Sequence, residues 1–435
     1  MSVVAPARKA CAVNPLKSSR TIGAALAFLG MERSLPLLHG SQGCTAFGLV
    51  LFVRHFRETI PLQTTAMSEV STILGGLDHI GEALRTIHKR ASPALVGLCS
   101  TALTETRGDD IAAYLEEFRR DHPGLGGMEV VYAPVPEFAG ALQDGWAVAV
   151  ERMVDRFARP AQARTPWQVN ILPGSHLTPG DVEEIRDTVE SFGLYPIVLP
   201  DLAGSLDGHV PETFLPHTLG GTPLGQARRM GESALTLALG EQMRPAAERL
   251  RSRCGVPFEV FDRLTGLGAW DAFVQRLCEA SESDPPARIR RQRSQLQDAM
   301  LDGHFHFGGK RVAVAGDPDL LFGLSSFLAD MGASVAVAVA TTGSPLLERV
   351  PCAETLVGDL EDFEVRAAGC DLLVTHSHGR QAARRLGIPL HRAGIPTFDR
   401  LGAAQKATVG YRGTRDLIFE LANTWMGHAP ADDRH

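Results

Sequence analysis

Cysteine is scarce in this 435-residue sequence, and none of it stands in the spacings that build disulfide or zinc frameworks. The seven cysteines are far apart and no C-x-x-C pair occurs. An odd number of widely spaced cysteines excludes a disulfide scaffold and a compact zinc ribbon. Most of them, Cys278 and Cys370 among them, are therefore expected to be small buried hydrophobic residues.

Long apolar runs and a large net charge are also absent. No stretch is long enough to cross a membrane, and the N-terminal residues show no continuous apolar segment of the kind found in signal peptides. The net charge of −7 is modest and argues against nucleic acid as a partner. We therefore expect a cytoplasmic protein that binds neither membranes nor nucleic acid.

Nucleotide-binding and hydrolase signatures are missing as well. There is no G-x-x-x-x-G-K-S/T, and AGDPD lacks the glycine spacing of a dinucleotide fingerprint. Neither G-x-S-x-G nor H-E-x-x-H occurs. The pairs His304/His306 and His376/His378 could suggest a metal, but hydrogen bonding at a strand end is the favoured interpretation. No catalytic residue is therefore assigned.

What the sequence does contain is an alternation of apolar, strand-like runs with helical patterns along almost its whole length. This alternation is typical of βαβ units and parallel sheets, and the length exceeds that of a single core. The sequence predicts an α/β fold of three Rossmann-like domains with mostly parallel sheets. We place these domains at 1–165, 166–300 and 301–400, followed by a C-terminal helical segment at 401–435.

One βαβ unit can be predicted in detail from LTPGDVEEIRDTVESFGLYPIVLPD. Thr178 is suited to cap a helix, Pro179 to occupy its first position, and Asp181 to complete the cap from three residues further on. Apolar residues then recur at spacings of three and four. Gly193 is expected to end this helix before YPIVLP resumes as a strand.

The stretch HGSQGCTAFG, residues 39–48, places Cys44 in a predicted loop of small and polar residues. Gly40 and Gly43 remove side-chain bulk on both sides, which would let the thiolate approach a large object. Iron–sulfur clusters commonly need four thiolates, so a chain with one good ligand would share its cluster with a partner across an interface. On spacing alone, a tight buried turn is the favoured alternative.

Longer runs of sequence resemble a known family. NPLKSSRTIGAALAFLGMERSLPLLHGSQGCTAFGLVLFVRHFRE closely resembles the N-terminal region of the nitrogenase molybdenum–iron protein β-subunit family. NILPGSHLTPGDVEEIRDTVESFGLYPIVLPDLAGSLDGH, GGTPLGQARRMGESALTLALGEQM and GYRGTRDLIFELANTWM resemble the branch of that family on which the iron–molybdenum cofactor is matured. The resemblance covers nearly the whole chain and implies the three-domain fold of nitrogenase component 1.

The departures from the family pattern bear on metal binding. Catalytic β-subunits carry two further cysteines, at positions where this chain has Ser19 and about Ala102, with Leu103 next. A chain that keeps only Cys44 cannot build its share of the larger eight-iron cluster. The resemblance implies that Cys44 gives one ligand to a 4Fe–4S cluster completed by three cysteines of the α-like partner NifE.

Two other cysteines could approach such a cluster. We expect Cys99 to be a small buried thiol and Cys11 to be an exposed, incidental one in an N-terminal arm. Neither is assigned as a ligand.

The resemblance further implies a scaffold for cofactor biosynthesis in nitrogen fixation rather than a catalyst. The chain would pair with NifE in an α2β2 heterotetramer, dock the nitrogenase iron protein transiently and meet cofactor-delivery proteins. The iron–molybdenum cofactor precursor would be held mainly by the partner, and His376 would be structural. The alternatives are a catalytic β-subunit of nitrogenase or of a protochlorophyllide-reductase-like enzyme, and a metal-free α/β binding protein in which Cys44 only packs.

Overall fold

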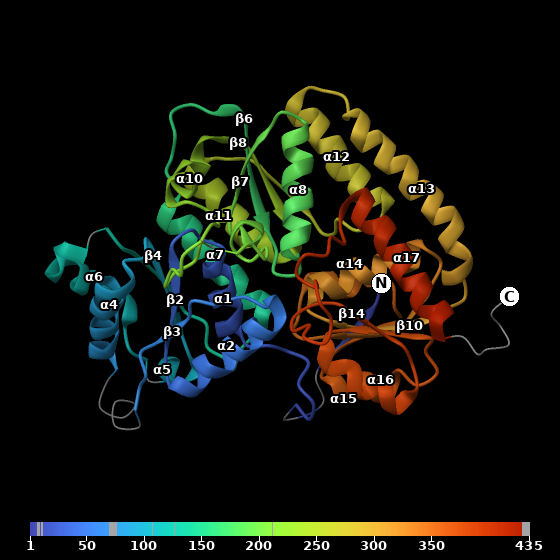
Figure 1. The fold of residues 1–435 in the computed structure, drawn as a ribbon, viewed down its shortest axis with the longest axis horizontal. Coiled ribbons are helices and arrows are strands. Elements are labelled where there is room, and N and C mark those ends of the chain that lie inside the picture. Colours follow the sequence, from blue (N-terminus) through green and yellow to red (C-terminus); the bar gives the residue numbers. More distant parts are fainter. Residues whose placement is uncertain are drawn as a thin grey trace.

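The computed structural model describes residues 1–6, 9, 12–68, 76–106, 108–125, 127–210 and 212–428. Within them the chain forms three β-sheets flanked by helices (Figure 1). Every strand pairing in these sheets is parallel. This architecture confirms the predicted α/β class. No helix in the described part of the chain has the length and apolar content needed to span a bilayer.

The first sheet has the strand order β3-β2-β4-β5. Its strands are β2 (Ser34–His39), β3 (Gln63–Thr64), β4 (Leu95–Ser100) and β5 (Glu129–Ala133). The helices of this part are α1 (Arg20–Leu29), α2 (Gln42–Phe56), α4 (Leu77–Ala91), α5 (Ala102–Glu105), α6 (Ile111–Asp121) and α7 (Leu142–Phe157). The first turn of α1 approaches α2 closely, since a Cβ on Gly48 would lie 2.6 Å from Ile22 Cδ1.

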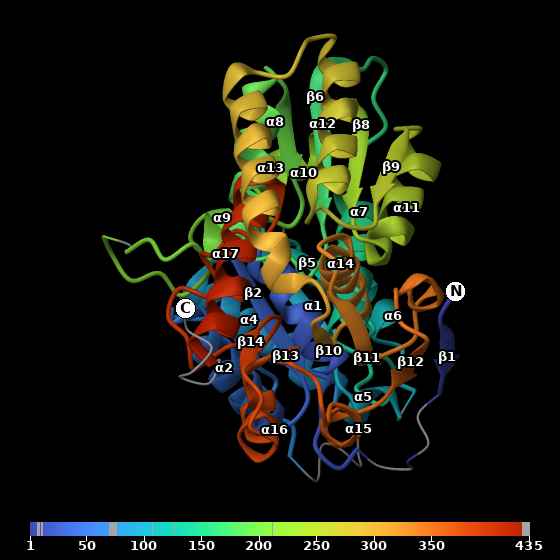
Figure 2. The ribbon, with the colours of Figure 1, turned by 90° about the vertical axis from the view of Figure 1, so that its right-hand side faces the viewer.

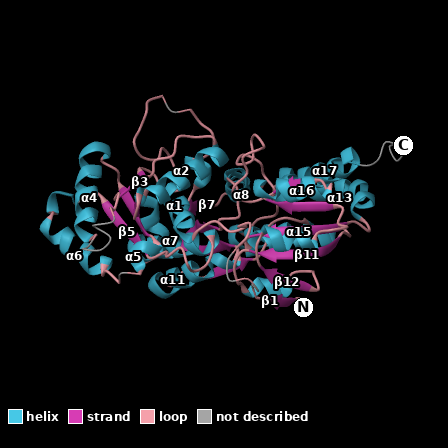
Figure 3. Ribbon diagram, turned by 90° about the horizontal axis from the view of Figure 1, so that it is seen from below, coloured by secondary structure: helices cyan, strands magenta, loops and turns pink. Residues whose placement is uncertain are grey.

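The second sheet has the order β7-β6-β8-β9. Its strands are β6 (Thr165–Pro173), β7 (Tyr195–Val198), β8 (Ser233–Leu239) and β9 (Phe258–Phe261). Its helices are α8 (Pro179–Ser191), α9 (Leu202–Ser205), α10 (Leu224–Arg229), α11 (Arg244–Cys254) and α12 (Leu267–Ser281). The loop between α9 and α10 projects from the body of the molecule (Figures 2 and 3) and is tied to the residues after α2, because Gly208 N donates to Glu58 Oε1 over 2.8 Å.

The third sheet has the order β1-β12-β11-β10-β13-β14. Its strands are β1 (Val3–Ala5), β10 (Arg311–Gly316), β11 (Ser334–Ala340), β12 (Glu354–Val357), β13 (Leu372–Thr375) and β14 (Leu390–Arg392). Its helices are α13 (Ala287–Phe307), α14 (Pro318–Asp330), α15 (Leu360–Arg366), α16 (Arg380–Leu386) and α17 (Gly410–His428). Strand β1 pairs with β12, so the first residues of the chain belong to the sheet formed by the last third of the sequence.

Helix α8 begins and ends where the sequence predicts. Thr178 is its N-cap, Pro179 stands in its first turn, and Thr178 and Asp181 form a reciprocal capping box. Gly193 follows the helix with a φ of +73°, a conformation that glycine adopts without strain. The Asp181 carboxylate also accepts hydrogen bonds from the Thr408 and Val409 amides, so this cap joins the second sheet to the segment before α17.

The two faces of the second sheet pack against different parts of the molecule. Ile171 packs in a core that includes α17 and the third sheet, whereas its neighbour Leu172 packs in a core with α1 and α7. Leu237 and Ala238 alternate in the same way, as consecutive side chains of a strand do. The second sheet therefore packs one face into a core shared with the third sheet and the other face into a core shared with the first sheet.

The C-terminal end of helix α13 corrects the prediction for His304 and His306. His304 and His306 lie in its last turn and not at a strand end. The buried residues Ala299, Gly303 and Phe307 recur at spacings of four, which extends the helix past both histidines. Phe307 packs edge-on against Trp425 of α17, with ring centroids 4.9 Å apart.

The two cysteines singled out as buried differ. Cys370 is buried, as predicted, whereas Cys278 is only partly buried at the edge of a core.

Candidate site at the first turn of helix α2

Cys44 lies in the first turn of helix α2 and not in a loop, which corrects the prediction for residues 39–48. Ser41 is the N-cap, and its Oγ lies 3.7 Å from the Cys44 Sγ. The helix starts this early because Thr45 and Gly48 begin a buried face that continues to Phe56. Cys44 itself is half-buried, so its sulfur is neither enclosed in the core nor fully in solvent.

The two glycines beside Cys44 have different surroundings. A Cβ on Gly40 would lie 2.6 Å from Thr101 Oγ1, so this glycine is required by packing inside the chain. A Cβ on Gly43 would meet only Ser41 Oγ, at 3.9 Å. Gly43 alone therefore leaves open space next to the thiol, as the approach of a bulky group requires.

The three family cysteine positions gather at one edge of the first sheet. Ser19 caps α1, and two residues later Thr21 Oγ1 donates to the carbonyl of Ser100 at the end of β4. Thr101 Oγ1 donates to the carbonyl of His39, at the end of β2 and just before the Cys44 turn. The structure thus places the starts of α1, α2 and α5 at the carboxyl ends of neighbouring parallel strands, where α/β sheets bind ligands.

At two of these positions the side chain offers no ligand to a metal. The Ser19 hydroxyl accepts a hydrogen bond from Ile22 N over 3.4 Å and so completes a helix cap. Ala102, the first residue of α5, has only a methyl group. Of the three positions, Cys44 alone offers a thiolate.

The other two cysteines weighed as ligands do not add to the site. Cys99 is 0% exposed, its Sγ lies 3.8 Å from the Gly97 carbonyl, and burial raises the pKa of its thiol, so it stays protonated inside the core. This confirms the prediction of a small buried thiol. Cys11 lies outside the described residues.

The residues fit one shared ligand and not a complete metal site. Across the described ranges, no group of three or more His, Cys, Asp or Glu side chains is placed to hold a metal ion. Cys44 offers a partly accessible sulfur at a helix N-terminus, where the free backbone N–H groups favour negative charge. An iron–sulfur cluster at Cys44 would therefore need its remaining ligands from another chain.

Helix α2 also carries an exposed apolar face that starts beside Cys44. Phe47, Val50 and Val53 are 69%, 55% and 39% exposed and follow one another at intervals of three residues. Contiguous exposed apolar side chains of this kind mark surfaces that contact another protein. The same helix thus presents a thiol and an interface-like surface.

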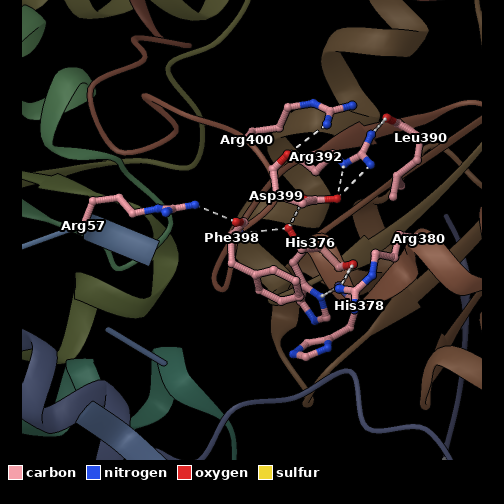
Figure 4. Close-up of polar contacts among 10 residues, drawn as sticks. Arg57, His376, His378, Arg380, Leu390, Arg392, Phe398, Asp399 and Arg400 are labelled. Carbon is pink, nitrogen blue, oxygen red and sulfur yellow. Dashed lines mark hydrogen bonds and ion pairs between the residues drawn. The ribbon is translucent and has the colours of Figure 1, made fainter. Parts of the chain in front are cut away.

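A cationic group lies at the other end of α2, around Phe398 (Figure 4). The Phe398 ring is flanked by the guanidinium carbons of Arg54 and Arg380, at 4.2 and 4.8 Å from its centroid. Arg57 reaches across to donate to the Phe398 carbonyl over 2.9 Å. These contacts bind the end of α2 to the segment that follows β14.

Polar contacts next to Phe398 explain the turn at residues 376–380, which contains His376 and His378. His376 Nε2 lies 2.8 Å from the Leu16 carbonyl, and burial lowers the pKa of His376 to about 4, so the ring is neutral and structural, as expected. Asp399 is paired with Arg392 over 2.9 Å and accepts a hydrogen bond from Ser377 (Figure 4). The paired histidines are therefore part of a hydrogen-bonded turn and hold no metal ligand set.

Sequence reasoning missed the group around Phe398. Arg54 and Arg57 stand three apart on one helix, which is a weak signal of a basic surface. Nothing local shows that residues more than 300 positions later pack against them.

Three parallel sheets joined by cores on both faces of the middle one, with a half-buried thiol at the first turn of a helix, define the class of this protein. The chain matches the family described as Nitrogenase component 1 type Oxidoreductase over residues 19–426 and belongs to that family. A solved structure described as "Nitrogenase Cp1 at pH 6.5" superposes with a TM-score of 0.93 at 31% identity, covering 98% of this chain and 97% of that one. A second, described as "Nitrogenase Cp1 at pH 5", has a TM-score of 0.74 at 14% identity and shares the fold alone.

Within the family, the chain is similar to proteins named nitrogenase iron-molybdenum cofactor biosynthesis protein NifN. The relative from Bradyrhizobium diazoefficiens is 55% identical over 439 residues, covering 100% of this chain and 94% of the relative. Relatives of the same name from Mesorhizobium japonicum and a Nostoc species are 54% and 51% identical, and each covers 98% of this chain and 94% and 96% of its own length. These matches confirm the resemblance predicted from the sequence runs.

Proposed function

We propose that this chain is the β-like subunit of a scaffold on which the iron–molybdenum cofactor of nitrogenase is matured. The names of its full-length relatives support this role. So does the departure at Ser19 and Ala102, because a catalytic β-subunit would have thiolates there. The observation that carries the proposal is the half-buried thiol of Cys44, which lies in a helix turn with open space at Gly43, while no set of three metal-ligating side chains occurs in the described ranges.

Cys44 would supply one thiolate to a 4Fe–4S cluster shared with the α-like subunit NifE. When bound, such a cluster supplies one-electron transfer, with a potential set by its surroundings. The chain's own part is to place the sulfur at the positive end of α2 and to leave room for the cluster beside Gly43. Because ligands come from both chains, subunit pairing and metal binding would stabilise each other.

The exposed face of α2 supports the pairing. It runs from Cys44 along Phe47, Val50 and Val53, so a subunit that completes the cluster would also cover this apolar surface. Two such pairs would form an α2β2 heterotetramer in the cytoplasm, with the cofactor precursor held mainly by NifE. The nitrogenase iron protein and cofactor-delivery proteins would dock on that assembly.

The cluster is tested by replacing Cys44. We expect Cys44→Ala to lower the iron content of the anaerobically purified complex and to abolish the electron paramagnetic resonance signal of the interface cluster. Cys278→Ala is the matched control, since Cys278 is a partly buried thiol on α12, and it should leave both readouts unchanged. Unchanged iron and signal in Cys44→Ala would contradict the proposal.

The pairing surface is tested independently. Val50→Glu places a charge on the exposed face of α2 and should reduce co-purification with NifE without unfolding the chain. Val365→Glu on α15, where the side chain is 74% exposed, is the control and should pair normally. Equal recovery of NifE with both variants would show that this face is not the interface.

A catalytic β-subunit of nitrogenase is the second candidate, favoured by the close superposition on a nitrogenase. Iron analysis separates the two roles, because a catalytic pair carries a cluster of eight irons at this interface and the scaffold pair would carry four. Eight irons at the interface would overturn the scaffold proposal.

A further inference from the structure

A cavity open at one side lies where α2, the loop after β6, the segment after β14 and helix α17 meet. Its volume is about 270 Å³. Small-molecule sites favour such places, at the carboxyl ends of parallel strands and between domains. The cavity shares no lining residue with the Cys44 turn.

The walls of the cavity are largely apolar. Leucine side chains from α14, β14 and α17 line it: Leu320, Leu324, Leu390 and Leu417. His55 closes one side, with its Nδ1 accepting a hydrogen bond from Thr397 N over 2.9 Å. Burial lowers the pKa of His55 to about 4, so this wall is uncharged near neutral pH.

The charges that line the cavity are unbalanced. Arg392, Arg400 and Lys406 face a single lining carboxylate, Glu420. Lys406 is paired with Glu420, which also lies 3.4 Å from His391 Nδ1. The pKa of His391 is lowered to about 3, chiefly by burial, so this ring adds no positive charge.

Arg400 is the lining cation that is best placed to bind an added anion. It is exposed at the rim, and its Nη1 donates to the main-chain oxygen of Asp399 over 2.9 Å (Figure 4). In the described part of the chain no carboxylate lies within ion-pair distance of its guanidinium, whereas Arg392 has Asp399. A guanidinium at the rim of an apolar cavity is suited to bind a carboxylate through two parallel hydrogen bonds.

The surface next to the rim is also positive. Arg54, Arg57 and Arg380 surround Phe398, two residues before Arg400, and none has a carboxylate partner within the described ranges. Cations gathered around a concavity raise the local concentration of anions. The rim of the cavity and the surface beside it therefore both favour a negatively charged ligand.

We propose that this cavity binds a small organic anion, with its carboxylate on Arg400 and a short apolar chain among the leucines. The inference does not depend on the cluster at Cys44, since the two sites share no residue. The cavity has both apolar walls and a cationic rim, so its ligand should have both an apolar part and a negative charge.

Hexanoate and hexanamide are the probes, because they match in size and differ in charge. Isothermal titration of the full-length chain should show hexanoate binding at least about tenfold more tightly than hexanamide, the effect of one charge-assisted hydrogen bond. Inorganic phosphate should bind more weakly than hexanoate because it lacks an apolar part. Equal binding of hexanoate and hexanamide, or of hexanoate and phosphate, would overturn the proposal.

Variants locate the site. Arg400→Gln should weaken hexanoate binding by roughly tenfold and leave hexanamide binding unchanged. Arg290→Gln on α13, remote from the cavity, is the control and should bind hexanoate as the unaltered chain does. If Arg380→Gln weakens binding as much as Arg400→Gln does, the anion sits on the Phe398 surface and the cavity assignment is wrong.

Discussion

Gly40 and Gly43 flank the same turn, but only one of them has room for a larger side chain. Gly40→Ala would drive a Cβ to 2.6 Å from Thr101 Oγ1 and should cost about 1–3 kcal/mol of unfolding free energy. Gly43→Ala meets open space and gains helix propensity, so it should be neutral or stabilising by up to about 1 kcal/mol. Urea denaturation of the two variants measures both. Equal destabilisation would contradict the different surroundings.

Asp319 is a buried carboxyl whose titration should be visible in stability. It is buried at the start of α14, accepts a hydrogen bond from Gln242 N over 3.3 Å, and burial raises its pKa to about 7 from an ordinary 3.8. The native state therefore keeps a proton that the unfolded chain loses, and this residue lowers stability as pH rises from about 4 to about 7.

Asp319→Asn removes that titration. The stability of the variant relative to the unaltered chain should increase by up to about 1.4 kcal/mol per pH unit over this interval and level off above it. Urea denaturation between pH 4 and 8 measures the difference, and contributions from buried histidines cancel in it. Parallel pH profiles would contradict the raised pKa.

At the scale of single elements, the N-terminus of α8 joins two parts of the chain. Thr178 Oγ1 accepts from Asp181 N over 3.0 Å and donates to the Lys406 carbonyl over 2.7 Å. Thr178→Ala loses both bonds and should cost about 1–2 kcal/mol in urea denaturation. Ser191→Ala at the other end of the same helix loses only a local bond to Thr188 and serves as the control. A smaller loss for Thr178→Ala than for Ser191→Ala would contradict the cap.

Helix α2 shows where element prediction fails. HGSQGCTAFG contains three glycines, and its composition predicts a loop, although Ser41 occupies the N-cap position of a helix that begins at Gln42. The buried face that stabilises the helix includes Phe52 and Phe56, well beyond the quoted stretch. Local composition favoured a loop, whereas packing along the full helix decided the outcome.

For the molecule as a whole, the second sheet contributes to two cores, and this coupling predicts one cooperative unfolding transition. Trp146 packs in the core that joins α7 to the second sheet, and its Nε1 donates to the Pro173 carbonyl over 2.9 Å. Trp270 packs in the core that joins the second sheet to the third. We consider two variants with a single tryptophan each, one keeping Trp146 and the other Trp270. In each variant the change in tryptophan fluorescence and the change in far-ultraviolet circular dichroism should have the same urea midpoint. Separate midpoints within one variant would show that the cores unfold independently.

The domain bounds at 165, 300 and 400 stay a prediction. Strand β1 lies in the third sheet, although its residues are the first of the chain. The two cores on the faces of the second sheet also contain side chains from the first and third sheets.

The parallel α/β class, the limits of α8 and the family can be predicted from the sequence, because alternating strands and helices, capping residues and long matching runs are local signals. That Cys44 lies in the first turn of a helix, that β1 joins the third sheet, and that His55 and Thr397 line one cavity depends on the folded structure. Those outcomes depend on contacts between residues up to several hundred positions apart, and local patterns of charge and hydrophobicity do not encode which distant segments meet.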